Sequence, residues 1–145
     1  MMLGNLADAT RSRFKSLSLH QSVQAAAETF ADGGLGLIVI CDAQDRAVGV
    51  VSKSDLVRHL ARGGSVRVAV TEVMTRPIIS ASPCDDLRAT WKLMVGRHLQ
   101  NLPLLDDDRR PVGTLDVRDA LQAVLAVEEE QEGQLVNYIA GIGYR

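Results

Sequence analysis

The stretch that decides the fold is Gly49-Val50-Val51-Ser52-Lys53-Ser54-Asp55, whose pattern returns 64 residues later as Gly113-Thr114-Leu115-Asp116-Val117-Arg118-Asp119. Residues 16–61 align with residues 80–125 without a gap. Nine aligned pairs are identical, namely Ser16/Ser80, Ser18/Ser82, Ala25/Ala89, Leu35/Leu99, Asp42/Asp106, Arg46/Arg110, Val48/Val112, Gly49/Gly113 and Asp55/Asp119. Similarity at one fixed offset indicates a repeated structural unit, so the sequence predicts two copies of one unit.

Each copy of the motif predicts a short apolar strand that ends in a polar residue and continues into a helix. Gly49 would allow a ligand or another backbone to come close. The Ser52 hydroxyl offers a donor and two acceptor lone pairs, and Asp55 falls in the first helical turn, where N–H groups lack partners. Two interpretations stay open: these two residues only cap the helix, or they bind a ligand, as a carboxylate does when it holds a ribose.

Length and composition indicate a globular protein with an aliphatic core. The chain has 145 residues, of which 46% are hydrophobic and 3% aromatic, and its net charge is −2. Few aromatics and no basic field argue against a nucleic-acid partner. No apolar run reaches the roughly 18–20 residues that span a membrane, and residues 1–10 do not resemble a secretory signal. We therefore predict a cytoplasmic protein with no nucleic-acid or membrane partner.

The regions before each motif predict a strand and a helix. A short strand is expected at Phe14-Lys15. Ser18-x-x-Gln21 and Ser82-x-x-Asp85 are candidate capping boxes, the second with Pro83 at the first helical position. Each following helix should have one apolar stripe. The stripes comprise Val23, Ala26, Ala27, Phe30 and Ala31 in the first copy and Leu87, Thr90, Trp91, Met94 and Val95 in the second.

Gly33-Gly34-Leu35-Gly36 indicates the end of a helix rather than a phosphate loop, because a phosphate loop follows a strand. Residues 37–41 form an apolar run that is typical of a strand buried on both faces, and residues 47–51 should return beside it. A second helix is expected at about residues 54–62. The second copy repeats the strand pair at residues 101–105 and 112–115.

We divide the chain into a first copy with its lead-in (1–62), a linker (63–72), a second copy (73–126) and a C-terminal helical tail (127–145). Gly133 is expected to interrupt the tail helix. The tail carries apolar residues, Tyr138 and Tyr144 after an acidic stretch, so it is a candidate dimer or partner contact. The alternative is that it folds back on its own domain.

Motifs for catalysis and metal binding are absent from the sequence. There is no P-loop, H-E-x-x-H or G-x-S-x-G, and the three histidines lack metal-ligand spacing. Cys41 and Cys84 have no C-x-x-C spacing, and Asp106-Asp107-Asp108 lacks the further ligands of a calcium loop. We therefore predict no enzymatic activity, no metal and no required cofactor.

Three motifs together resemble a tandem pair of CBS (cystathionine beta-synthase) domains of the stand-alone bacterial type. Val73-Met74-Thr75-Arg76-Pro77 resembles the family's lead into a repeat, and residues 97–104 resemble its H-L…L-P-V strand. The motifs that begin at Gly49 and Gly113 resemble its signature G-h-h-S/T-x-x-D, in which h is hydrophobic. The resemblance covers roughly residues 10–126.

The resemblance implies a mixed α/β (α+β) fold, in which two β-α-β-β-α repeats pack through their sheets as a pseudo-twofold pair, a Bateman module. It also implies a non-catalytic regulatory module, such as an energy sensor. Such a module binds AMP, ADP, ATP, NAD(H) or S-adenosylmethionine in the clefts between repeats and signals through a change in conformation or assembly. A homodimer is expected, with an unidentified regulated protein as a further partner.

Carried over to this chain, the resemblance assigns ligand-binding roles in two clefts. The first cleft would use Gly49, Ser52, Lys53, Asp55, Arg58, Ile38 and Ile40. The second would use Gly113, Asp116, Arg118, Asp119, Pro103, Leu104, Ile79 and Ser80. The motif aspartates would hold ribose, Ser52 and the cations would hold phosphate, and the apolar residues, together with Ser80 in the second cleft, would flank adenine.

The second motif departs from the family pattern, because Asp116 stands where a serine or threonine belongs. A carboxylate beside a phosphate is repulsive and is strongly disfavoured when desolvated. Arg118 occupies a position that often faces phosphate in the family, where the first copy has Ser54. We therefore expect one occupied cleft, the first. The alternative function is a structural dimer with vestigial clefts that docks a partner through its C-terminal tail.

Overall fold

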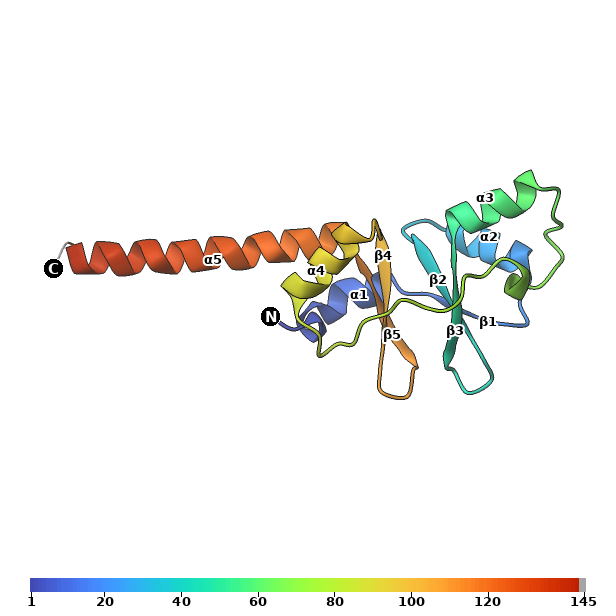
Figure 1. Cartoon of the computed structure of the whole chain (residues 1–145), viewed down its shortest axis with the longest axis horizontal. Helices are drawn as coiled ribbons and strands as arrows, with labels where there is room; N and C mark the ends of the chain where they lie inside the picture. Colours follow the sequence, from blue (N-terminus) through green and yellow to red (C-terminus); the bar gives the residue numbers. More distant parts are fainter. Residues whose placement is uncertain (144–145) are drawn as a thin grey trace.

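The repeated motif forms the same elements in both copies. The computed structural model describes the backbone of residues 1–143 and the side chains of residues 1–133. Its elements are η1 (Leu3–Leu6), α1 (Ala7–Ser12), β1 (Ser16–Ser18), α2 (Val23–Ala31), β2 (Leu37–Cys41), β3 (Ala47–Ser52), α3 (Lys53–Ala61), η2 (Val70–Glu72), α4 (Leu87–Gly96), β4 (Asn101–Leu105), β5 (Pro111–Asp116) and α5 (Val117–Gly143). Figure 1 shows the two copies side by side, with α5 running away from them.

The two sheets share one plan, and the predicted β-α-β-β-α order is confirmed. In the first copy β1 pairs parallel to β2, and β2 pairs antiparallel to β3. In the second copy β4 pairs antiparallel to β5, and a single parallel bridge from Ala81 to Leu104 stands in for the first strand. The strand predicted at Phe14-Lys15 forms slightly later, at Ser16–Ser18.

The predicted helix starts are wrong by one turn in both copies. The N-cap of α2 is Ser22, whose hydroxyl accepts from the Ala25 N–H, and the N-cap of α4 is Asp86. Residues 82–85 form a turn instead, in which the Ser82 N–H donates to the Asp85 carboxylate at 2.9 Å. Pro83 therefore lies before the helix, because a second capping residue follows the first and lets α4 begin later.

Most residues of the two predicted apolar stripes point into separate cores, but Ala31 and Val95, which we also placed in the stripes, are exposed. Val23, Ala26 and Phe30 are buried on α2, and Leu87, Thr90 and Met94 are buried on α4. All five residues of β2 are buried, which confirms a strand covered on both faces. Gly33 and Gly34 have positive φ angles of 87° and 80°, so they end α2 in a conformation that glycine favours.

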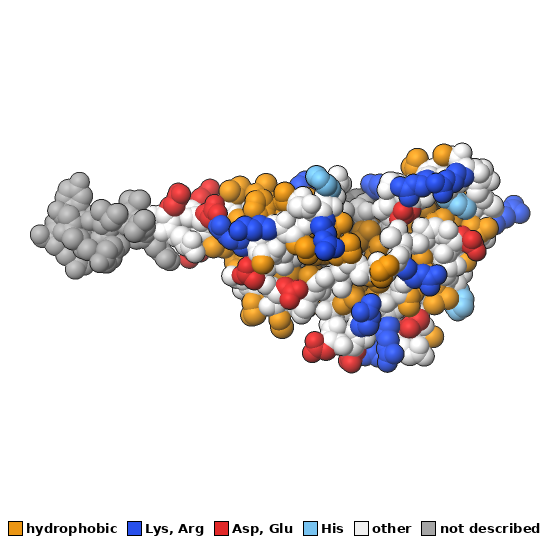
Figure 2. Space-filling view, in the orientation of Figure 1, with side chains coloured by type: hydrophobic (Ala, Val, Ile, Leu, Met, Phe, Trp, Pro, Cys, Tyr) orange, Lys and Arg blue, Asp and Glu red, His pale blue; other side chains and the backbone are white. Residues whose placement is uncertain are grey.

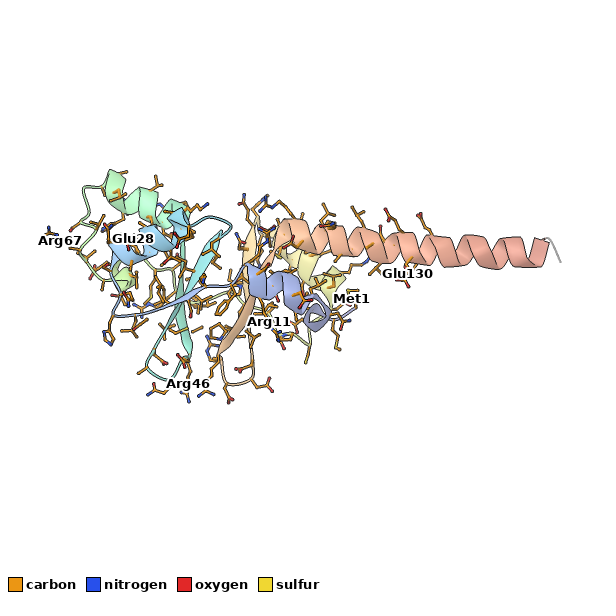
Figure 3. The ribbon with its side chains drawn as sticks, turned by 180° about the vertical axis from the view of Figure 1, so that it is seen from behind. Met1, Arg11, Glu28, Arg46, Arg67 and Glu130 are labelled. Atoms are coloured by element: carbon orange, nitrogen blue, oxygen red, sulfur yellow. The ribbon has the colours of Figure 1, made fainter. Side chains whose placement is uncertain are left out.

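The segment before each copy packs against the other copy. Leu3 is 0% exposed within the core of the second copy, and Val70 is 0% exposed within the core of the first. Figure 3 shows Met1 and Arg11 on the α5 side of the molecule. The chain therefore crosses between its copies twice, so each copy is completed by residues that precede the other.

The motif glycines make this crossing possible. A Cβ atom at Gly113 would lie 2.7 Å from the Thr10 hydroxyl, and one at Gly49 would lie 2.5 Å from the Met74 sulfur. Thr10 and Met74 are 64 residues apart, the same offset that separates Gly49 from Gly113, so the two contacts occupy equivalent places in the repeat. The space that we predicted for a ligand next to Gly49 and Gly113 is thus filled by side chains of this chain.

A third apolar cluster joins the two sheets. Val39, Cys41, Ala47 and Leu105 are buried in it, with Phe14 and Ile78 packed alongside. The Ala47 N–H also donates to the Arg109 carbonyl at 2.9 Å, which links the two hairpins. The copies therefore pack through their sheets, as predicted.

The last helix is longer than the sequence suggested. α5 runs from Val117 to Gly143 without a break, so the expected interruption at Gly133 is wrong. One glycine inside a helix costs only about 1 kcal/mol relative to alanine. The predicted tail contacts of Tyr138 and Tyr144 lie outside the residues whose side chains are described. Within the described chain, no helix combines the length and apolar character needed to cross a membrane.

Candidate ligand-binding cavity

A cavity of about 1040 Å³ lies where the two copies meet. It is lined by Arg13, Gly34, Leu35, Gly36, Leu37, Ser52, Lys53, Ser54, His98, Leu99, Gln100, Asn101, Asp116, Val117 and Arg118. Most of these residues form pairs that are 64 positions apart, such as Ser52 with Asp116 and Ser54 with Arg118. The cavity therefore has two equivalent halves, each built from one copy of the repeated motif.

Strand register explains why these segments meet. Leu37 at the start of β2 pairs with Ser52 at the end of β3, and Asn101 pairs in the same way with Asp116. Antiparallel neighbours place the start of one strand beside the end of the other. The glycine-rich stretch before β2 and the His98–Asn101 stretch before β4 thus line the same cavity as the two motifs.

In the first half, Ser52 and Asp55 form a capping box. The Asp55 N–H donates to the Ser52 hydroxyl at 3.2 Å, and the Ser52 N–H donates to the Asp55 carboxylate at 2.9 Å. Arg58 donates to the other Asp55 oxygen at 3.3 Å. Asp55 and Arg58 line a separate hollow of about 190 Å³ and do not line the cavity. Of the two interpretations of Asp55, a helix cap or a ligand-binding residue, the contacts in the structure are those of a helix cap.

Two polar side chains next to this cap face the cavity. Lys53 and Ser54 are both exposed and both line the cavity. The Ser52 and Ser54 hydroxyls lie 2.9 Å apart and share a hydrogen bond. Among the described residues, no carboxylate lies within ion-pair distance of Lys53. With respect to residues 1–133, the first half therefore presents an ammonium group without an ion-pair partner beside two hydroxyls.

In the second half, Asp116 is paired within the chain. Asp116 is only 5% exposed to solvent. Arg118 donates from Nε to one carboxylate oxygen at 3.0 Å and from a terminal nitrogen to the other at 2.9 Å, and the Arg118 N–H donates at 2.8 Å. Bidentate arginine–carboxylate pairs of this kind are among the stronger side-chain interactions. The hydrogen bonds from Arg118 hold the pKa of Asp116 below its usual value, and those to Asp116 raise the pKa of Arg118.

Arg13 joins the same cluster from the start of the chain. Its Nε donates to Asp119 at 2.7 Å, a terminal nitrogen donates to the other Asp119 oxygen at 3.3 Å, and another nitrogen lies 3.8 Å from Asp116. The hydrogen bond to Asp119 raises the pKa of Arg13. Asp119 is thus held by an arginine, as Asp55 is in the first copy, and neither motif aspartate lines the cavity.

The apolar residues that we predicted beside adenine do not reach the cavity. Ile38 and Ile40 are 0% exposed in the core of the first copy, and Leu104 is 1% exposed in that of the second. Pro103 is also buried, whereas Ile79 is 41% exposed and Ser80 is half-buried, outside the cavity lining. Side chains alternate along a strand, and Ile38 and Ile40 lie on the face that α2 and α3 cover.

Arg13, His98 and Asn101 line the cavity although sequence reasoning did not select them. His98 and Asn101 occupy positions equivalent to Gly34 and Leu37, which also line the cavity, but no motif in either stretch marked it as part of a site. Asn101 Oδ1 is buried without a hydrogen-bond partner among the described residues, as is Thr114 Oγ1. Buried polar atoms normally have partners, so the Asn101 oxygen is an exception, and it has almost no surface that is open to the cavity.

Neither cysteine adds a thiol to the cavity lining. Burial raises the pKa of the Cys41 thiol to about 11, with Asp45 and Asp42 adding to the effect, so this thiol is protonated at neutral pH. Cys84 is exposed and lies outside the cavity. Within the described chain, no three His, Cys, Asp or Glu side chains are grouped as metal ligands.

Comparison with known proteins agrees with this architecture. The family model for the CBS domain matches residues 6–62 and again residues 70–126. An uncharacterized protein of Methanopyrus kandleri is 29% identical over 105 residues, which are 68% of this chain and 54% of that protein, so the chain spans about half of this relative.

Two solved structures share the fold at low sequence identity. The CBS domain pair of protein MJ0100, in complex with 5-methylthioadenosine and S-adenosyl-L-methionine, superimposes with a TM-score of 0.73 at 20% identity, covering 88% of this chain and 98% of that one. The CBS domain protein PAE2072 from Pyrobaculum aerophilum, complexed with AMP, has a TM-score of 0.73 at 21% identity, covering 82% and 89% of the two chains.

Proposed function

The chain belongs to the CBS domain family, and we propose that it is a regulatory module that binds an adenosine-containing ligand in the cavity between its copies. CBS domain pairs are generally regulatory rather than catalytic, and neighbours of this fold bind AMP, S-adenosylmethionine or 5-methylthioadenosine. A volume of about 1040 Å³ also lies at the upper end of the range for small-molecule sites.

The observation that carries this proposal is the ammonium group of Lys53 at the first turn of α3, which has no ion-pair partner among residues 1–133. Its charge, the Ser52 and Ser54 hydroxyls and the positive end of the helix all favour an anion at one place. AMP, ADP, ATP and NAD(H) bring such an anion as phosphate. The proposed site therefore uses Ser52, Lys53 and Ser54, and it does not use Ile38 or Ile40.

In this proposal the ligand is a signal and the protein is not an enzyme. A ligand shifts the balance between two conformations only by the difference in its affinity for them. The output would be a change in conformation or in assembly that a regulated protein senses. The identity of the nucleotide, an energy-sensing role and the cytoplasmic location all stay predictions.

We expect a thermal-shift panel to select an adenosine ligand. At a hundred times its Kd, a ligand adds about 2.7 kcal/mol to stability, which raises the Tm by a few degrees. AMP, ADP, ATP, NAD⁺, NADH and S-adenosylmethionine would be compared, with GTP as the control. Lys53→Ala should weaken a phosphate-bearing ligand about 10- to 100-fold, because it removes a charge-assisted bond of roughly 1.5–3 kcal/mol.

Arg67→Ala is the matched control, because Arg67 is an exposed cation outside the cavity lining (Figure 3). Its variant should bind like the parent protein. The protein should also be denatured and its supernatant examined near 260 nm for a nucleotide retained through purification. If no ligand shifts the Tm and the supernatant contains no nucleotide, the proposal is wrong.

Exposed apolar side chains favour self-association as a second candidate role. Leu121 and Leu125 on α5 are 40% and 48% exposed, and Leu93 and Val95 on α4 are 38% and 50% exposed. Figure 2 shows hydrophobic atoms gathered where these helices meet the body. Leu121 and Leu125 are four positions apart and so share one face of α5; because exposed apolar groups that lie together mark interaction sites, we include a homodimer through this face in the proposal.

Sedimentation equilibrium tests this homodimer. Leu121→Glu combined with Leu125→Glu should convert the dimer into a monomer, because charges would be buried in an apolar interface. Gln122→Glu is the control, since it adds charge to the same helix without removing an apolar side chain. A parent protein that is monomeric, or a double variant that remains dimeric, would exclude this surface.

A further inference from the structure

Positions 52 and 116 are equivalent in the repeat, yet one is serine and the other is aspartate. Both residues line the cavity, each at the end of its strand. We propose, on the premise of the function above, that Asp116 is a specificity-determining residue. Its carboxylate occupies the anion position of the second half and closes that half to phosphate, so a phosphate-bearing ligand binds only in the first half.

The contacts of Asp116 are those that a bound anion would make. Both of its oxygens accept from the Arg118 guanidinium, and one also accepts from the Arg118 N–H in the first turn of α5. An arginine fork and a helix N-terminus are common ligands of phosphate groups. Asp116 therefore uses the donors that would otherwise be available to a ligand.

Because Asp116 is paired with Arg118, the two halves of the cavity differ in their unpaired charge. Arg13 and Arg118 are balanced by Asp116 and Asp119 in the second half, all within one connected cluster. In the first half Arg58 is paired with Asp55, so within the described part of the chain the charge of Lys53 has no partner. Among the residues whose side chains are described, an anion entering the first half meets one free cation, whereas in the second half it meets two arginines that already have partners.

Entry of a phosphate into the second half would also bring it next to a buried carboxylate. Asp116 is 5% exposed and its pKa is held down by Arg118, so it is ionised at neutral pH. Like charges at short range in a desolvated site repel strongly. An uncharged nucleoside does not meet this repulsion, so the restriction applies to the phosphate and not to adenosine.

The chain itself offers a matched pair of substitutions. Serine and aspartate are both good N-cap residues, and each caps its own helix here. Asp116→Ser therefore removes the internal anion while it keeps the cap of α5. Ser52→Asp places a carboxylate in the first half while it keeps the cap of α3. Neither substitution should unfold the protein, which circular dichroism would verify.

Isothermal titration calorimetry with AMP and with adenosine tests the proposal on the full chain. We expect one AMP per chain for the parent protein, two for Asp116→Ser, and at least a 10-fold loss of AMP affinity for Ser52→Asp. The variant that combines Ser52→Asp with Asp116→Ser should bind one AMP, now in the second half. The affinity for adenosine should change less than threefold in each single variant.

Three results would overturn the proposal. The parent protein could bind two AMP molecules with similar affinity, or Asp116→Ser could leave the stoichiometry at one. Equal changes in adenosine and AMP binding would show that position 116 acts on the shape of the site and not through charge. If neither AMP nor adenosine binds to any variant, the proposed function itself is wrong. The three results above all require binding, so they overturn only the role of Asp116.

Discussion

Replacing Leu3 by alanine is expected to destabilise the protein by about 2–5 kcal/mol, the cost of emptying a fully buried leucine site. Leu3 is the third residue of the chain, yet it is 0% exposed and packs in the core of the second copy with Leu87, Met94, Leu102 and Leu115. The Leu3 N–H also donates to the Asp85 carbonyl at 2.9 Å, which fixes the segment in place. Urea denaturation of the parent protein and the variant would measure the difference.

Met2→Ala is the control for this experiment, because Met2 is 53% exposed. Exposed substitutions of this kind usually change stability by less than about 0.5 kcal/mol. If Leu3→Ala has an equally small effect, the N-terminal segment does not contribute to the core of the second copy, and the crossing of the two lead-in segments is wrong.

Gly113→Ala is expected to cost at least about 1–3 kcal/mol, the range for overpacked core sites. The new Cβ would lie 2.9 Å from the Thr10 Cβ and 3.3 Å from its backbone carbonyl carbon. Thr10 is 3% exposed, so it has little space in which to move. α1 would have to shift away from β5, and the Tm should fall accordingly in a calorimetric scan.

Two further glycines calibrate this result. Gly49→Ala should cost less, because its closest contact is the flexible end of the Met74 side chain. Gly96→Ala should stabilise by up to about 1 kcal/mol, since nothing lies within 4 Å of the new atom and alanine is the better helix former. A Gly113→Ala variant as stable as Gly96→Ala would contradict the close contact between α1 and β5.

Much of the local structure was predictable because it depends on neighbouring residues. The apolar stripes of α2 and α4 and the buried run of β2 follow from periodicity alone. The helix starts were less predictable, because Ser18 and Ser22 are both good caps and only the surrounding contacts select the second. Likewise, a single glycine at position 133 did not end α5, since the cost of one glycine is small.

The candidate site was predicted only in part. Ser52, Lys53, Asp116 and Arg118 do line a cavity, but they share one cavity, whereas we expected two separate clefts. Asp55 and Asp119 do not line it; Asp55 is paired with Arg58 and Asp119 with Arg13. Arg13 could not be found from the motif, because it contacts Asp119 across 106 positions of the chain.

The sequence by itself determined that this protein has two copies of one unit, the order of the strands and helices within each copy, and the difference between Ser52 and Asp116. These properties depend on repetition and on short-range patterns of polarity. Only the tertiary structure decided which copy each lead-in segment completes, which side chains fill the space above the motif glycines, and which arginine holds each aspartate. Those outcomes depend on contacts between residues far apart in the chain, which no local pattern specifies.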